Sequence, residues 1–159
     1  MDATPETIDH SAADHQLVGR IRKRRAELRT AEEQLTSAAA APSSARLDLW
    51  WAKVSHATAE LATRFLEHVD DTERDGGLFD EVANAAPRLN RDLDRLRADH
   101  RDISAALRAL TEAPQPTSPD DISARREQIL DVLSHLARHR FSGSDLLYEA
   151  YQVDIGAAD

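Results

Sequence analysis

The sequence contains no cysteine, which excludes several classes of site. Disulfides, thiolate catalysis, cysteine-ligated zinc and iron–sulfur clusters all require that side chain. Cysteine-free chains also suit a reducing compartment, because disulfides are rare there. We therefore expect a cytoplasmic protein.

Glycine and aromatic residues are scarce, with five glycines and 4% aromatic residues among 159. The core must therefore consist mostly of Leu, Ile, Val and Ala, and this composition favours helix. No apolar run approaches membrane-spanning length, and the polar, acidic stretch at residues 1–6 does not resemble a signal peptide. A chain of this length predicts one soluble domain with a sizeable core and no membrane association.

A formal net charge of −9 argues against nucleic acid or an anionic membrane as a partner. The basic run at residues 20–25 does not change this, because helical geometry spreads its side chains around the exterior among acidic neighbours. Glycine-rich phosphate loops and nucleophile elbows are also absent from the sequence. The sequence therefore offers no nucleotide-binding loop and no nucleophile of that type.

Apolar residues recur at helical spacing in four segments separated by Pro, Gly and Ser. The first helix is expected to begin between Thr7 and Asp14 and to end near Ala39. The other three are expected at about 45–74, 87–112 and 120–141, with a short extra turn at 78–82. This pattern predicts an all-α protein, an antiparallel up-down-up-down four-helix bundle with a short C-terminal extension.

The ends of the chain differ from the bundle in composition. Residues 1–10 are expected to form a flexible N-terminal tail and residues 11–141 the bundle. Asp120 or Asp121 is the expected cap of the fourth helix, and Gly143 the expected break at its end. Residues 142–159 are too apolar for disorder and are expected to pack on the end of the bundle.

Seven histidines are present, and an exposed histidine on a helix is ordinarily a solvated residue. His68 and His100 differ because each lies on the apolar stripe of its helix. A core-facing histidine must have its ring nitrogens satisfied, and metal coordination is one way to do so. His56 points away from His68 and is interpreted as a surface residue.

His135 and His139 lie four residues apart on one helical face, which makes them a candidate pair of metal ligands. Both lie at the edge of the apolar stripe, with His139 nearer its centre. In an antiparallel bundle His68, His100 and His135 fall at one level. We therefore expect the imidazoles of residues 68, 100 and 135 to converge.

The first helix offers two histidines. His15 matches the level of His68 if the chain turns near residue 42, whereas His10 fits the phase of the apolar stripe better but lies further out. We favour His15. Separately, Trp50 and Trp51 are interpreted as packing residues, with a dimer contact as the alternative.

The arrangement resembles the hemerythrin-like, or HHE cation-binding, four-helix bundles over roughly residues 14–149. The residues that carry the resemblance are Asp14-His15, His68 with Leu78-Phe79, Asp99-His100 with Ile103, Leu107 and Leu110, and His135 with Leu146-Leu147. Members of that family hold a non-haem di-iron centre with histidines from all four helices and two bridging carboxylates. They bind or sense oxygen, nitric oxide or peroxide, or handle iron.

The resemblance implies a metal site made of His15, His68, Glu73, His100, His135 and His139. Two positions depart from the family pattern. Thr72 stands where a glutamate is usual, so Glu73 or Asp71 becomes the candidate carboxylate. In the fourth helix, His139 itself occupies the usual carboxylate position.

The resemblance implies a non-haem iron protein, with one ion or two, that binds or senses a small diatomic ligand or peroxide, or handles iron, rather than acting as a high-turnover enzyme. The alternative is a metal-free bundle that serves as a protein-interaction module through its C-terminal tail and tryptophan pair. A third interpretation is a di-metal oxidase or peroxidase, which usually needs more carboxylates. A homodimer or a protein partner fits the first two interpretations.

Overall fold

The computed structural model describes residues 10–44 and 46–152, with side chains from residue 19 to 151 within them. Its secondary structure over this range is helical, without strands, which confirms the all-α part of the predicted fold. The elements are α1 (His10–Ala40), α2 (Leu47–Glu73), α3 (Leu78–Ala85), the 3₁₀ turn η1 (Pro87–Leu89), α4 (Asn90–Glu112) and α5 (Pro119–Gln152).

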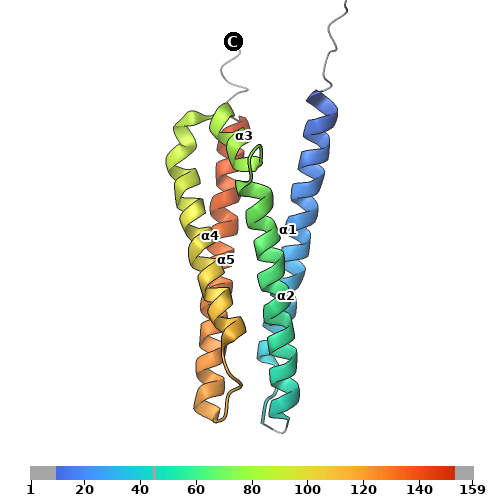
Figure 1. The fold of residues 1–159 in the computed structure, drawn as a ribbon, viewed down its shortest axis with the longest axis vertical. Coiled ribbons are helices and arrows are strands. Elements are labelled where there is room, and N and C mark those ends of the chain that lie inside the picture. The colour runs from blue at the N-terminus through green and yellow to red at the C-terminus, as the bar shows by residue number, and fades with distance from the viewer. Residues whose placement is uncertain (1–9, 45, 153–159) are drawn as a thin grey trace, which may run out of the picture.

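The four long helices lie side by side and form a closed ring of neighbours (Figure 1). α1 packs on α2, α2 on α4, α4 on α5 and α5 on α1. The short helix α3 and the turn η1 lie at one end, where they connect α2 to α4. No helix in the described range is both long and apolar enough to cross a membrane.

The last helix differs from the prediction, because α5 continues through Gly143 to Gln152 instead of ending near residue 141. A glycine inside a helix costs about 0.5–1 kcal/mol relative to alanine. Burial of Leu146 and Ala150 offsets this cost, since both continue the buried stripe of Leu136 and His139 at helical spacing. The predicted break at Gly143 was therefore wrong. Residues 153–159 and 1–9 lie outside the described range, so the predicted tails are not described.

The start of α5 also differs from the predicted cap at Asp120 or Asp121. Ser118 Oγ accepts a hydrogen bond from the Asp121 backbone N–H, and the Asp121 carboxylate accepts one from the Ser118 N–H. This reciprocal pair is a capping box, with Ser118 as the cap and Pro119 in the first helical position. Asp121 is its distal partner.

Two apolar clusters form the core. One lies among α1, α2, α4 and α5 and contains the larger part of the core, including Phe65, Ile103 and Leu136. The other joins α3, η1, the first half of α4 and the end of α5, through residues such as Phe79, Leu96 and Leu146. Histidines occupy the level between them: His100 follows Leu96 and precedes Ile103, and His139 separates Leu136 from Leu146.

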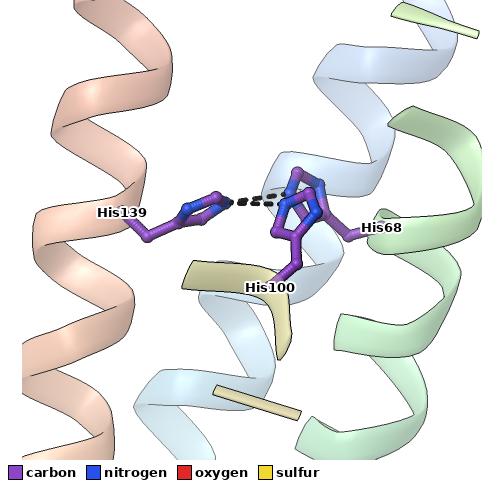
Figure 2. A group of neighbouring side chains, drawn as sticks. All are labelled: His68, His100 and His139. Carbon is purple, nitrogen blue, oxygen red and sulfur yellow. Dashed lines mark hydrogen bonds between the residues drawn. The ribbon is translucent and has the colours of Figure 1, made fainter. Parts of the chain in front are cut away.

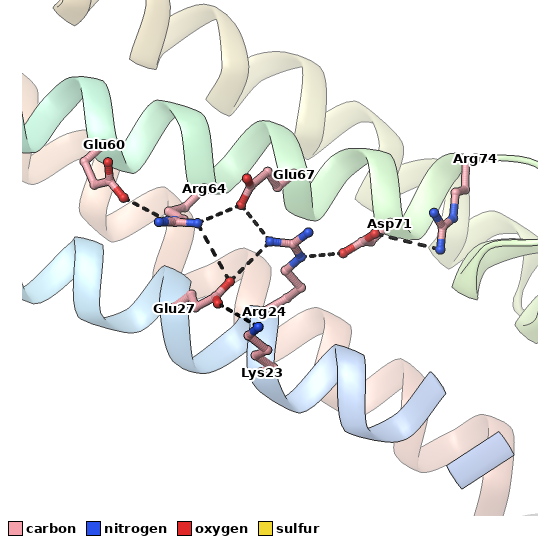
Figure 3. A network of polar contacts seen from close by, with 8 residues as sticks. All are labelled: Lys23, Arg24, Glu27, Glu60, Arg64, Glu67, Asp71 and Arg74. Atoms are coloured by element: carbon pink, nitrogen blue, oxygen red, sulfur yellow. Dashed lines mark hydrogen bonds and ion pairs between the residues drawn. The ribbon is translucent and has the colours of Figure 1, made fainter. Parts of the chain in front are cut away.

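A network of ion pairs lies on the outer face of α1 and α2 (Figure 3). Arg24 is its centre: its Nε lies 2.7 Å from Asp71 Oδ2 and its Nη1 lies 2.8 Å from Glu67 Oε2. Arg64 joins Glu67 to Glu60, and Lys23, Glu27 and Arg74 extend the network at its edges. The network joins the turns of α1 and α2 that face each other.

The tryptophan pair packs as the ordinary interpretation predicts. Trp50 is 2% exposed, and Arg126 lies over its ring. Trp51 is half-buried under Arg125. Both rings therefore already have intramolecular partners.

Candidate metal centre

Three histidines from three helices converge at the level between the two apolar clusters (Figure 2). His68 comes from α2, His100 from α4 and His139 from α5. The His139 Nε2 atom lies 3.1 Å from His100 Nε2 and 3.3 Å from His68 Nε2. One ring nitrogen from each histidine lies within 4.8 Å of the other two.

Burial keeps these imidazoles neutral. The His100 and His139 residues are 1% and 6% exposed, and His68 is half-buried. Desolvation, together with the neighbouring histidines, lowers the pKa of His68 and of His100 to about 3. Desolvation likewise lowers the pKa of His139, although Asp99 opposes this shift. Three neutral imidazoles at pH 7 have lone pairs available for a metal without prior loss of a proton.

Carboxylates lie beside the outward-facing Nδ1 atoms of two of the rings. Glu73 Oε1 lies 2.5 Å from His100 Nδ1. Asp99 Oδ2 lies 3.5 Å from His139 Nδ1 without forming a hydrogen bond, so that buried nitrogen has no hydrogen-bond partner among the described residues. A carboxylate only accepts hydrogen bonds, so Glu73 places the proton of neutral His100 on Nδ1 and leaves the Nε2 lone pair facing inward. Metal-bound histidines in proteins are oriented in this way by an outer carboxylate.

The inward-facing Nε2 atoms are better arranged to bind a cation than to form hydrogen bonds with one another. If His139 is also protonated on Nδ1, towards Asp99, its Nε2 lone pair faces that of His100 at 3.1 Å. If it is protonated on Nε2, that single N–H cannot point at both His68 and His100. Imidazole nitrogens that share one ion at about 2.0–2.1 Å lie roughly 3.0–3.4 Å apart, which matches the two measured separations.

Aromatic rings close the group above and below. The Phe79 ring stacks on His100 at 5.4 Å, with an interplanar angle of 5°. The Phe65 ring lies edge-on to His100 and His139 and tilted against His68, at 5.8–6.2 Å. These contacts restrict the imidazole orientations, so the group is preorganised.

Helix α1, which supplies none of these three histidines, contributes Arg25 at this level. A cavity of about 40 Å³ is lined by Arg25 and Leu28 of α1 together with His68 and His139. His15 lies ten residues before Arg25 in α1, or about 15 Å along the helix. The predicted level match between His15 and His68 was therefore wrong, because Arg24 and Arg25 are the α1 residues that lie level with Asp71 and His68. The His15 and His10 side chains are outside the described range.

His135 does not join the group. Its Nε2 atom lies 3.2 Å from Asp99 Oδ1, and its side chain is 26% exposed. His139 is in phase with the buried residues Val132, Leu136 and Leu146, whereas His135 lies at the edge of that stripe. The expected convergence of residues 68, 100 and 135 is corrected to residues 68, 100 and 139.

The candidate carboxylates take other positions. Asp71 pairs with Arg24 on the outer face, and Glu73 contacts the far nitrogen of His100. Thr72 is buried, and its hydroxyl donates to the His68 and Val69 carbonyls of its own helix. Among the described residues, then, no carboxylate lies within the histidine group.

Sequence reasoning missed roles for Asp99, Arg25 and Phe65. Asp99 directly precedes His100, and adjacent helical residues point about 100° apart. That offset turns Asp99 toward α5, where His135 and His139 lie on its side. The spacing of His135 and His139, with Asp99 on the neighbouring helix, could have indicated this interaction from the sequence. Arg25 was hidden inside a basic run that appeared to be fully solvent-exposed.

The fold and the site define a helical protein with a candidate three-histidine metal centre. The model of the Hemerythrin HHE cation binding domain matches residues 7–151, which is most of the chain. The chain therefore belongs to this hemerythrin family, as the resemblance predicted. Searches of curated proteins and of solved structures gave no match.

Proposed function

We propose that the protein binds one metal ion through His68, His100 and His139. The convergence of their three Nε2 atoms carries the proposal. Family membership supports iron as the ion, and imidazole also suits zinc, copper and nickel. A metal held by three protein ligands keeps open positions where a small molecule such as oxygen, nitric oxide or peroxide binds.

The donor set fits a single ion better than a carboxylate-bridged pair. Bridged di-iron centres in helical bundles use several glutamates that project inward. Here Thr72 and His139 occupy the positions where the family pattern has carboxylates, and Glu73 and Asp99 contact the outer nitrogens. Their role is to hold the imidazoles in place and to keep protons on the outer nitrogens.

The role that fits these features is binding or sensing rather than turnover. The cavity beside His68 and His139 has a volume of about 40 Å³, which suits one very small molecule. A larger substrate has no room on that side. The absence of cysteine supports a cytoplasmic location, where a sensor of iron or of diatomic gases meets its ligand.

We also propose the antiparallel up-down-up-down topology for the bundle. Three hydrogen bonds support it by joining opposite helix ends. Arg126, near the start of α5, donates to the Ala39 carbonyl at the end of α1. Arg88, before α4, donates to the Glu149 carbonyl near the end of α5. Gln115, after α4, donates to Asp48 at the start of α2.

Metal titration of two matched variants tests the site. His135→Ala and His139→Ala remove the same group from the same helix, four residues apart. Cobalt(II) and anaerobic ferrous iron are titrated into chelator-treated protein, and binding is followed by optical spectrum and by metal content after desalting. We expect wild type and His135→Ala to retain one ion per chain, and His139→Ala to bind more than about 100-fold more weakly. Equal binding by the two variants would exclude the proposed ligand set.

The same titration tests the metal-free alternative, an interaction module. One observation favours that alternative: α5 exposes the large apolar side chains of Leu130, Phe141 and Tyr148, at 59–67%. If wild type retains no metal under saturating conditions and the three histidine rings titrate without effect on stability, the module interpretation replaces the metal site.

A further inference from the structure

A groove of about 550 Å³ lies between α2 and α4 and is lined in part by His100, which does not line the small cavity beside His68 and His139. It extends along α4 from His100 to Glu112, and Glu73 closes its end on α2. This volume lies within the usual range of small-molecule sites. Nothing in the proposed metal chemistry requires a groove of this size.

Small residues on both helices create the groove. Ala62 on α2 and Ser104 and Ala105 on α4 line it, where larger side chains would fill the space. Its base is apolar and firm, because Phe65 and Leu107 are 0% and 1% exposed. An apolar chain that lay along this base would remove a continuous hydrophobic surface from water.

Two positive charges line the same groove. Arg101 and Arg108 are seven residues apart, so both project from one face of α4. Neither forms an ion pair or hydrogen bond with another described side chain. By contrast, Arg95 and Arg97 of the same helix pair with Asp92 and Asp94. Unpaired guanidinium groups beside an apolar surface match an anion that carries a hydrocarbon chain.

The acidic groups of the groove limit the ligand to one charge. Glu73 and Glu112 lie at its two ends, with the arginines between them. A second negative group on an extended ligand would approach one of these carboxylates and be repelled. A dianion whose charges span the groove is therefore disfavoured.

We propose that this groove binds an elongated apolar molecule with a single anionic headgroup, such as an aliphatic carboxylate. The chain packs on Phe65, Val69 and Leu107, and the headgroup pairs with Arg101 or Arg108. The proposal goes beyond the metal site and does not depend on it.

Calorimetric titration of the full chain with three eight-carbon ligands tests this proposal. Octanoate, 1-octanol and octyltrimethylammonium share the chain and differ in the headgroup. Chelator-treated protein is used, so that failure of metal binding cannot affect the result. We expect octanoate to bind about tenfold more tightly than the neutral ligand, since a charge-assisted pair contributes on this scale, and the cation to bind most weakly. Equal affinities for the three ligands, or no octanoate binding, would overturn the proposal.

Matched variants locate the site. Arg101→Gln with Arg108→Gln should reduce the octanoate affinity about tenfold, to the level of octanol. Arg95→Gln removes the same charge outside the groove and should leave binding unchanged. Ala105→Trp fills the groove and should abolish binding of all three ligands, whereas Ala109→Trp, on an exposed turn outside it, should not. If sedimentation shows a dimer that Ala105→Trp dissociates, a second copy covers the groove and the small-ligand proposal is wrong.

Discussion

Two polar regions lie at the same level of the bundle and differ in almost every property. On the outer face, Arg24 and its acidic partners Glu67 and Asp71 form charged pairs with about a quarter to a third of each side chain exposed. Inside, His68 and its two partner histidines form a neutral group with no opposite charge among them. Glu67 and His68 are adjacent in the sequence, so one turn of α2 supplies both regions.

The comparison distinguishes charged groups that already pair with one another from buried imidazoles whose inward nitrogens lack partners and could bind a ligand. Each charge of the outer network already has partners, and solvent screens their attraction, so the pairs contribute little to stability. The three imidazoles are buried, and their inward nitrogens cannot all be paired within the group. Buried polar atoms without partners cost about 1–3 kcal/mol each, which a bound cation would recover.

The largest expected difference between the regions is the response of stability to metal. Free metal at 1,000 times Kd should raise the free energy of unfolding by about 4 kcal/mol, because only the folded chain assembles the site. The triple variant with alanine at residues 68, 100 and 139 should lose this increment. Arg24→Ala should retain it in full. Thermal unfolding with and without chelator measures both, and an equal metal response in the triple variant would contradict the account.

Acid should also distinguish the two regions in metal-free protein. The folded-state pKa values of His68 and His100, about 3, lie below the usual 6.5, and that of His139 is lowered as well. The unfolded chain therefore binds more protons, and stability is full above pH 6.5 and is lost as the pH falls below it. Between pH 7 and 5.5 the loss is about 1 kcal/mol for each of His68 and His100, and the lowered pKa of His139 adds to it in the same direction.

Urea unfolding at the two pH values measures this loss. His68→Leu should remove about 1 kcal/mol of it, because leucine cannot titrate. His56→Leu, at an exposed position outside the group, is the matched control for replacing one imidazole by leucine. A wild-type stability that does not change between pH 7 and 5.5 would show that the imidazoles are not held neutral.

The outer carboxylates should have an intermediate effect. Glu73→Gln keeps a hydrogen-bond acceptor near His100 but removes its charge, and Asp99→Asn does the same near His139. Each should weaken metal binding by about 10- to 100-fold, as loss of an outer partner of a metal-bound histidine usually does. Asp71→Asn, whose partner is Arg24, should have no effect on metal affinity. Isothermal titration with cobalt(II) compares the three variants.

The smallest effect is expected in the outer network itself. Arg24→Ala should lower the free energy of unfolding by no more than about 1 kcal/mol per lost pair, because the pairs are partly exposed. The loss should shrink at 1 M salt, where screening is stronger. Urea unfolding at low and high salt checks this expectation. A salt-independent loss of several kcal/mol would mean that Arg24 acts through packing rather than charge.

Much of the fold was predictable because helical periodicity and Pro/Gly/Ser loops are local signals. The all-helical class and the approximate bounds of α1, α2 and α4 followed from them. The end of α5 did not, since the penalty of Gly143 is local while the burial of Leu146 and Ala150 depends on α3 and α4, which lie far away in sequence. Local sequence signals could not show that the burial of Leu146 and Ala150 outweighs the helix penalty of Gly143.

The site was predictable in part for the same reason. His68 and His100 lie on strong apolar stripes, and the structure brings them together. The phase of the α5 stripe already favoured His139 over His135, but the expected level of each residue along the bundle favoured His135 as the converging residue. The position of α1 along the bundle axis relative to α2 could not be predicted. The prediction relied on loop length, whereas the pairing of Arg24 with Asp71 depends on side chains.

X-ray absorption at the metal edge of iron- or cobalt-loaded protein tests the central claim most directly. The account predicts one ion per chain with three imidazole nitrogens in its first coordination shell and no second metal nearby. Scattering from a neighbouring metal, together with bridging carboxylate oxygens, would contradict it. So would full retention of the ion by a variant that lacks His68, His100 and His139.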